Sequence, residues 1–112
     1  MEVEIKKEEN CTVVSVKGRL DTANYLKLEK QLDNLIKEGA KCLVVDCLDL
    51  VYVSSSGLRV FLIALKELNK QNGKFAICNL QESIKEIFEI SGFISIFDVY
   101  DTKESALEAC SA

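Results

Sequence analysis

The chain of 112 residues contains no histidine and no proline, and its basic residues form no run. Without histidine it lacks a common general base and metal ligand. Its five cysteines show no Cys-x-x-Cys spacing, so we expect neither a metal site nor a cofactor. The net charge of −4, from 18 acidic and 14 basic residues, offers no electrostatic footprint for nucleic acid or an anionic membrane. If the chain has a macromolecular partner, we therefore expect a protein.

Long hydrophobic runs are also absent. The longest, residues 60–65, is far too short to cross a bilayer, and residues 1–7 lack the apolar stretch of a secretory signal. These features predict a cytoplasmic protein whose cysteines are reduced and act as small buried hydrophobes. With 48% apolar residues and no proline, the sequence predicts one compact domain of dense regular structure over residues 1–112.

Strand and helix patterns alternate along the chain, which predicts an α/β fold with helices packed on one sheet. Strands are expected over residues 3–7, 12–17, 41–46, 74–78 and 96–99, with a short edge of sheet at the end of 48–53. Helices are expected from about 22 to 38, 55 to 71 and 102 to 110, and a further helix contains Ile84, Ile87 and Phe88 and is ended by Gly92. Asp21 or Thr22 is a candidate cap of the first helix, and Asp101 with Glu104 a candidate capping box for the last. The continuous apolar run 42–45 is typical of a central strand covered on both faces.

Three consecutive serines, Ser54, Ser55 and Ser56, precede Gly57 at the start of the second helix. There the helical N–H groups lack partners, and the positive end of the helix dipole favours anions. A serine at this position can cap the helix, which contributes about 1 kcal/mol, or can carry a phosphate. Capping explains one serine and not three. Gly57 either leaves the surface open to the backbone of a partner or lets the helix pack closely on the sheet.

The second helix has more apolar residues than one buried face requires. Helical spacing places five of them in one stripe: Leu58, Phe61, Leu62, Leu65 and Leu68. Val60, Ile63 and Ala64 lie away from this stripe, beside Arg59. Either neighbouring helices cover Val60 and Ile63, or these two residues form a docking patch with Arg59 beside the serines.

Four parts of the sequence share a pattern with one family: residues 18–21, residues 43–46 with 50–58, residues 87–93, and residues 97–107. Over nearly its whole length the chain resembles a STAS domain of the anti-sigma-factor antagonist type. The resemblance implies a single STAS domain with a mixed sheet of about five to six strands and about four packed helices. It also implies a regulator that binds an anti-sigma factor serine kinase and thereby releases a sigma factor.

In the family pattern an acidic residue precedes a phosphorylated Ser or Thr, which Ser-Gly-Leu follows. In this chain Ser54 stands at the acidic position, Ser55 at the phosphoacceptor and Ser56 at the companion serine. The resemblance therefore implies that phosphorylation of Ser55 switches binding off, with Ser56 or Ser54 as alternative acceptors. The expected partner-binding residues are Asp21, Ser54, Ser55, Ser56, Gly57, Arg59, Val60 and Ile63.

The sequence offers no catalytic constellation of its own. It has neither a Gly-x-Gly-x-x-Gly motif nor a phosphate-loop lysine, and nothing in it provides a base that would activate Ser55. Asp21 and Asp49 are interpreted as cap or turn residues. The alternative function is a STAS scaffold or ligand-sensing module in a larger signalling assembly, in which the serine does not switch. In either case we expect a monomer or a weak dimer.

Overall fold

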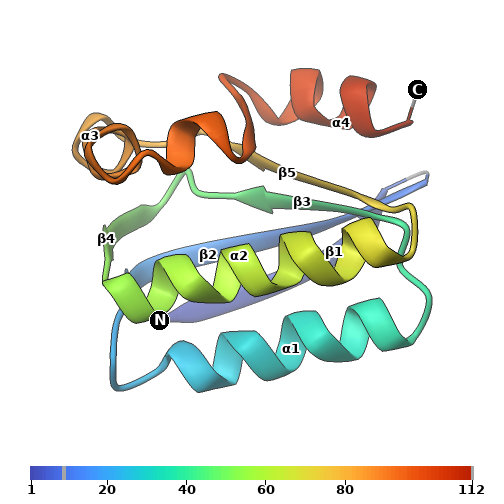
Figure 1. Cartoon of the computed structure of the whole chain (residues 1–112), viewed down its shortest axis with the longest axis horizontal. Coiled ribbons are helices and arrows are strands. Elements are labelled where there is room, and N and C mark those ends of the chain that lie inside the picture. The colour runs from blue at the N-terminus through green and yellow to red at the C-terminus, as the bar shows by residue number, and fades with distance from the viewer. Residues whose placement is uncertain (9, 112) are drawn as a thin grey trace.

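A computed structural model describes residues 1–8 and 10–111 (Figure 1). In these residues six strands form one mixed sheet and four α-helices pack on it, which confirms the predicted fold class. The strands are β1 (Glu2–Glu8), β2 (Cys11–Leu20), β3 (Cys42–Asp46), β4 (Leu50–Val53), β5 (Lys74–Cys78) and β6 (Asp98–Tyr100). The helices are α1 (Tyr25–Lys37), α2 (Ser55–Lys70), α3 (Glu82–Ser91) and α4 (Lys103–Ser111), with a 3₁₀ turn η1 (Phe93–Ser95). None of the described helices is long and apolar enough to span a membrane.

Strand β2 is shared between two parallel neighbours. The sheet order is β1-β2-β3-β5-β6, in which β1 and β2 are antiparallel, and β4 pairs with β2 outside this path. Residues 12–15 of β2 pair with β3, and residues 18–20 pair with β4. Gly18, the first residue of the second part, has φ +85°, and the register shifts between Gly18 and Arg19. This bulge brings the ends of β2 and β4 side by side, so that Asp21 and Ser54 follow two neighbouring strands.

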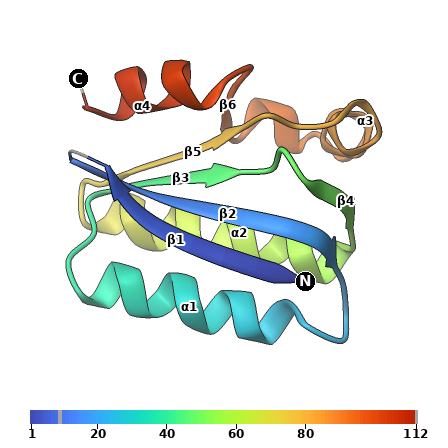
Figure 2. The ribbon, with the colours of Figure 1, turned by 180° about the vertical axis from the view of Figure 1, so that it is seen from behind.

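The central strands are buried on both faces, as the apolar run 42–45 predicted. Helices α1 and α2 cover one face of the sheet, and α4 covers the other (Figure 2). Leu43 and Val45 of β3 belong to the larger hydrophobic cluster, with α1, α2 and α3, whereas Val44 faces the smaller cluster beneath α4. Because successive side chains of a strand point to opposite faces, double coverage produces an uninterrupted apolar sequence.

Helix α4 is capped one residue later than predicted. Thr102 Oγ1 accepts a hydrogen bond from the Ser105 N–H at 3.1 Å, and the Thr102 N–H lies 3.4 Å from Ser105 Oγ. This is the reciprocal arrangement of a capping box, with Thr102 and Ser105 in the places predicted for Asp101 and Glu104. The pairs 101/104 and 102/105 have the same spacing of three residues, so the spacing alone does not distinguish them. The predicted capping box is therefore wrong by one residue.

The cysteines are not all reduced thiols. Cys11 and Cys42, on paired strands β2 and β3, form a disulfide with their Cα atoms 4.7 Å apart. For these two residues the prediction of reduced cysteines is therefore wrong. Cys47 and Cys78 are free and buried, in agreement with their interpretation as small hydrophobes. Burial raises the pKa of Cys78 to about 12 and also raises the pKa of Cys47, so both remain protonated thiols near neutral pH.

Candidate functional site

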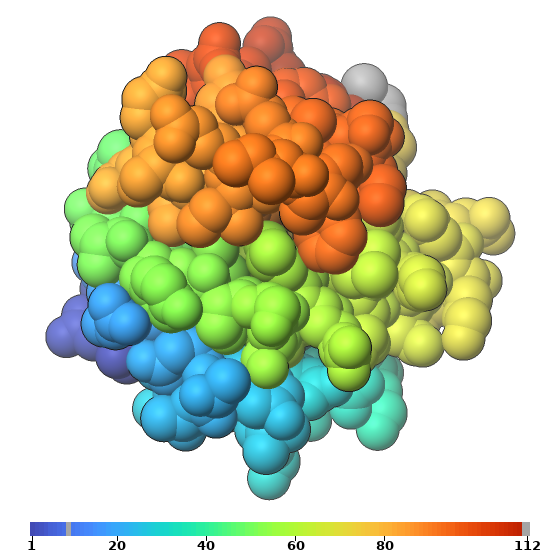
Figure 3. All heavy atoms as spheres, turned by 60° about the vertical axis from the view of Figure 1, so that its left-hand side comes forward, coloured from blue at the N-terminus to red at the C-terminus, as the bar shows by residue number. Residues whose placement is uncertain are grey.

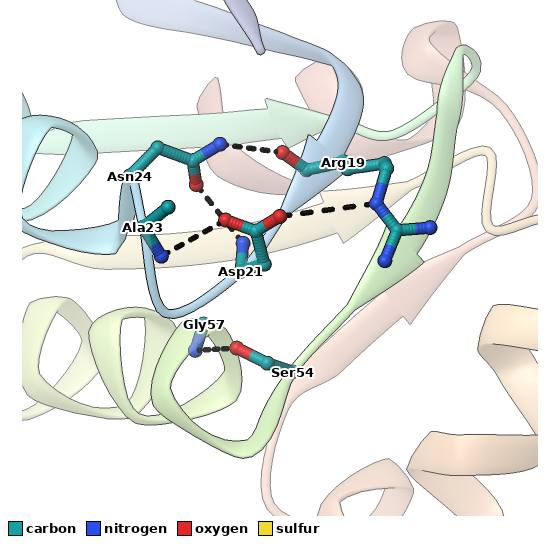
Figure 4. A network of polar contacts seen from close by, with 6 residues as sticks. All are labelled: Arg19, Asp21, Ala23, Asn24, Ser54 and Gly57. Atoms are coloured by element: carbon teal, nitrogen blue, oxygen red, sulfur yellow. Dashed lines mark hydrogen bonds and ion pairs between the residues drawn. The ribbon is translucent and has the colours of Figure 1, made fainter.

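The three serines lie where β4 passes into α2. Figure 4 shows Ser54, the first of them, next to the turn that follows β2. Leu20 and Val53 are paired at the ends of these strands, and the Ser54 N–H donates to the Leu20 carbonyl at 2.9 Å. The start of α2 is therefore tied to the sheet by backbone hydrogen bonds. In Figure 3 this part of α2, in green, lies at the surface between α1 in cyan and α3 in orange.

The serines have three different environments. Ser54 is the N-cap of α2, with φ −87° and ψ 171°, and its Oγ accepts the Gly57 N–H at 3.2 Å. Ser54 and Ser56 are half-buried, whereas Ser55, the first residue of the helix, is exposed. One serine is thus used for capping, and it is the serine that stands at the acidic position of the family pattern. Ser55 is the most exposed residue of the three.

Gly57 is buried, although it was predicted as a partner-binding residue. A Cβ atom added there would lie 2.7 Å from Leu20 Cγ and 2.9 Å from Val53 Cγ2, which is far closer than normal van der Waals contact. The absence of a side chain lets the first turn of α2 pack directly against the ends of β2 and β4. Of the two explanations for this glycine, the structure supports close packing. A direct contact with a partner is contradicted by its burial.

Asp21 is a turn residue and does not cap α1. Its Oδ1 accepts the Ala23 N–H at 3.0 Å, and the N-cap position is occupied by Asn24, so the predicted cap at Asp21 or Thr22 is wrong. The Asn24 amide fixes the turn from the other side: Oδ1 accepts the Asp21 N–H and Nδ2 donates to the Arg19 carbonyl, both at 2.9 Å (Figure 4). The turn holds the half-buried Asp21 beside the serines, which agrees with its interpretation as a cap or turn residue.

An arginine and an aromatic ring extend this surface. The Arg19 guanidinium carbon lies 4.1 Å from the centre of the Tyr52 ring, and Arg19 Nε lies 3.8 Å from Asp21 Oδ2. The cation is therefore held between a π face and a carboxylate. Arg19 and Tyr52 are register partners across β2 and β4. This contact could not be predicted from the sequence, because it depends on how two distant segments pair.

The predicted docking patch on α2 is only partly exposed. Arg59 is exposed and Ile63 is 39% exposed, but Val60 is 2% exposed and is removed from the patch. Helix α1 lies beside α2, and an open groove of about 520 Å³ between them is lined by residues that include Leu32, Val60 and Ile63. Val60 and Ala64 are buried, whereas Leu62 and Leu65 of the predicted stripe are only half-buried. The buried face of α2 is therefore rotated from the predicted stripe towards Val60 and Ala64.

One cluster of side chains able to ligate a metal is found among the described residues. The sulfur atoms of Cys11, Cys42 and Cys110 lie within 4.8 Å of one another. Two of the three are bonded to each other, which leaves Cys110 as the one free thiol of the cluster. A single thiol does not make a metal site. The sequence did not indicate this cluster, since its members lie on three separate elements.

Comparison with known families identifies the domain. A model of the STAS domain family matches residues 2–106. The chain belongs to the STAS domain family. The match includes all six strands, the three serines and the start of α4.

Two relatives of this STAS chain are named as antagonists of anti-sigma factors. BtrV of Bordetella bronchiseptica, named as a candidate anti-sigma factor antagonist, is 36% identical over 109 residues, which are 97% of this chain and 94% of BtrV. The anti-sigma-B factor antagonist of Bacillus subtilis is 32% identical over 107 residues, which are 95% of this chain and 96% of that protein. These names describe regulators, in agreement with the prediction that the chain is not an enzyme.

Solved structures share the fold. A candidate anti-sigma factor antagonist of Thermotoga maritima superposes with a TM-score of 0.93 at 20% identity, covering 98% of this chain and 95% of that one. SpoIIAA of Bacillus has been solved in two forms. The unphosphorylated form has a TM-score of 0.77 at 19% identity, covering 96% of each chain, and the phosphorylated form has 0.75 at 20% identity, covering 96% of this chain and 98% of SpoIIAA. At these identities the comparison establishes the STAS fold and no more.

Proposed function

We propose that this STAS domain is an anti-sigma factor antagonist that binds an anti-sigma factor serine kinase in the cytoplasm and is released when the kinase phosphorylates Ser55. The observation that carries the proposal is the exposure of Ser55 at the first turn of α2, beside the half-buried Ser54 and Ser56. The names of the relatives support the class of partner. The absence of a catalytic constellation in this chain means that the phosphate has to come from another protein.

The exposed residues of α2 define a surface that includes the proposed acceptor. Ser55, Arg59 and Ile63 are spaced four residues apart, which places them along one side of the helix over two turns. All three are exposed. A partner that contacts the Ser55 hydroxyl would therefore also contact Arg59 and Ile63. We define Ser55, Arg59 and Ile63 as the α2 stripe.

Phosphorylation would change this surface without changing the fold. A phosphoryl group adds a charge of about −1.5 to −2 and three strong acceptor oxygens to a position that is neutral when unmodified. A phosphate on Ser55 would lie one helical turn from the Arg59 guanidinium and could pair with it. The partner would then lose its contacts with both the neutral Ser55 hydroxyl and the Arg59 guanidinium. A hundredfold loss of affinity corresponds to about 2.8 kcal/mol.

The rigidity of the start of α2 supports a switch of this kind. Ser54 caps the helix, Gly57 packs against the sheet, and the Ser54 N–H is bonded to Leu20. An added phosphate on the exposed side of Ser55 disturbs none of these contacts. For SpoIIAA, structures of the phosphorylated and unphosphorylated forms both have the fold of this chain, so in that protein the modification is compatible with one fold.

The site assignment is tested by locating the phosphate. The partner is recovered from the native host with the unphosphorylated chain as bait, and is incubated with ATP and the wild-type chain, Ser55→Ala, or Ser56→Ala as the matched control. We expect mass spectrometry to find phosphate on Ser55 in the wild type and in Ser56→Ala, and none in Ser55→Ala. Phosphate on Ser54 or Ser56 in the wild type would overturn the assignment. Self-association into large particles without any kinase-dependent modification would favour the scaffold alternative.

The docking surface is tested with a pair of exposed isoleucines. Ile63 on α2 is 39% exposed, and Ile90 on α3, outside the α2 stripe, is 87% exposed. We expect Ile63→Asp to weaken binding of the recovered partner by roughly tenfold or more, because it places a charge in an apolar contact, and Ile90→Asp to leave binding unchanged. Equal affinities for wild type and Ile63→Asp would exclude the α2 stripe as the docking surface.

A further inference from the structure

A second group of reactive side chains lies on the face of the sheet that α4 covers, away from α2. Cys11 comes from β2, Cys42 from β3 and Cys110 from α4, and their sulfur atoms lie within 4.8 Å of one another. Cys11 and Cys42 form the disulfide, and Cys110 is a free thiol. The proposed phosphorylation switch makes no use of these residues.

The three cysteine residues differ in their exposure to solvent. Cys11 and Cys42 are each 4% exposed, so a dissolved disulfide or thiol cannot approach them directly. Cys110 is half-buried and lies in the last turn of α4, where a helix frays most easily. The preceding part of α4 is anchored, because Ala106 is fully buried and Lys74 Nζ donates to the Ala109 carbonyl at 3.3 Å. Cys110 is therefore both near the buried pair and the most exposed residue of the three.

We propose that Cys110 is a thiol–disulfide exchange site through which small disulfides and thiols oxidise and reduce the buried Cys11–Cys42 pair. In the oxidising direction, the Cys110 thiolate attacks one sulfur of a small disulfide, forming a mixed disulfide and releasing one small thiolate. The Cys42 thiolate then attacks Cys110 Sγ, forming a Cys42–Cys110 bond and releasing the second small thiolate. Finally the Cys11 thiolate attacks Cys42 Sγ, forming the Cys11–Cys42 bond and releasing Cys110.

The exchange balances in atoms and electrons. One small disulfide is reduced to two small thiols, which take up the two protons that Cys11 and Cys42 lose, and one protein disulfide is formed. Cys110 begins and ends as a thiol. With excess small thiol the same steps run in reverse, and the buried bond is reduced without direct access of the reagent to it.

The surroundings of Cys110 set the pH dependence of the exchange. Burial raises the pKa of Cys110, the Lys74 ammonium opposes this, and the Asp98 carboxylate adds to it. Tyr100 and Cys78 also interact electrostatically with this thiol and are neutral near pH 7. Only a small fraction of Cys110 is therefore the attacking thiolate at neutral pH, and the rate of exchange increases as the pH is raised towards the pKa.

The proposal is tested by oxidising the fully reduced full-length chain with glutathione disulfide. Formation of the Cys11–Cys42 bond is followed over time by quenching with an alkylating reagent and peptide mass spectrometry. The variants are Cys110→Ser and, as a control that removes a thiol outside the cluster, Cys47→Ala. We expect the bond to form roughly tenfold or more slowly in Cys110→Ser, and at the wild-type rate in Cys47→Ala. Formation of the bond in Cys110→Ser at the wild-type rate would overturn the proposal.

A second variant traps the intermediate step. In Cys42→Ser, Cys11 and Cys110 are the remaining cysteines of the cluster. Within the cluster only the Cys11 thiolate can then attack Cys110 Sγ in the mixed disulfide and release glutathione. We expect a Cys11–Cys110 disulfide without bound glutathione, since the two sulfurs lie within 4.8 Å of each other. Circular dichroism checks that the variant is folded. A folded variant in which glutathione stays on Cys110 while Cys11 remains a free thiol would contradict the exchange.

Discussion

Replacing Ser54 and Ser55 one at a time by alanine separates capping from signalling. Ser54 Oγ accepts the Gly57 N–H at 3.2 Å, and this bond is lost in Ser54→Ala. Loss of an N-cap serine costs about 1 kcal/mol, which for a chain of this size lowers the melting temperature by roughly 4 °C. Ser55 is exposed within the helix, where alanine is the better helix former, so Ser55→Ala is expected to change stability by less than about 0.5 kcal/mol.

Two measurements on the same variants decide the roles. Urea unfolding followed by circular dichroism gives the midpoint and the slope, and an unchanged slope ensures that the midpoint reports stability. Phosphate incorporation with the recovered kinase is measured in parallel. We expect Ser54→Ala to be less stable but still phosphorylated, and Ser55→Ala to be stable but unphosphorylated. If Ser55→Ala is less stable than the wild type while Ser54→Ala has unchanged stability, the assignment of Ser54 as the capping residue is refuted.

Three further predictions concern packing, titration and capping. Gly57→Ala is expected to lower stability by about 1–3 kcal/mol in urea, since its Cβ would lie 2.7 Å from Leu20 Cγ; unchanged stability would contradict the close contact. The Cys78 thiol titrates at its ordinary value of 9.0 when unfolded but at about 12 when folded, so over this pH range unfolding releases a proton and stability falls as the pH rises. Urea unfolding at several pH values should show a shallower fall in Cys78→Ala than in wild type, and equal slopes would refute the shift. Thr102→Ala is expected to cost about 1 kcal/mol in thermal unfolding and Asp101→Ala less than about 0.5 kcal/mol; the reverse order would restore the originally predicted capping box.

Features that depend on local sequence could be predicted. The run 42–45 identified a central strand, because coverage on both faces removes the polar residues that otherwise alternate in a strand. The pattern of residues 74–78 matched β5, and Gly92 ends α3 with φ +82° as its position suggested. At the site, the sequence placed the serines at the start of a helix, and the structure confirms that position.

Features that depend on contacts between distant segments could not be predicted. The sequence pattern allows Val60 to be a docking residue, but Val60 is buried on α2, against which α1 packs. The Cys11–Cys42 bond arises from the pairing of β2 with β3, and cysteine spacing along the chain carries no information on that register. The Arg19–Tyr52 contact likewise follows from the pairing of β2 with β4 beyond the bulge at Gly18.

Two dissociation constants decide whether phosphate on Ser55 ends binding to the kinase partner. The recovered anti-sigma factor is titrated with the unmodified chain and with the chain carrying phosphate on Ser55 alone, with Ser55→Ala as a control that ATP cannot modify. We expect Ser55→Ala to bind like the unmodified chain and the phosphorylated chain to bind roughly a hundredfold more weakly, which corresponds to about 2.8 kcal/mol. Equal dissociation constants for the phosphorylated and unmodified chains would contradict this expectation.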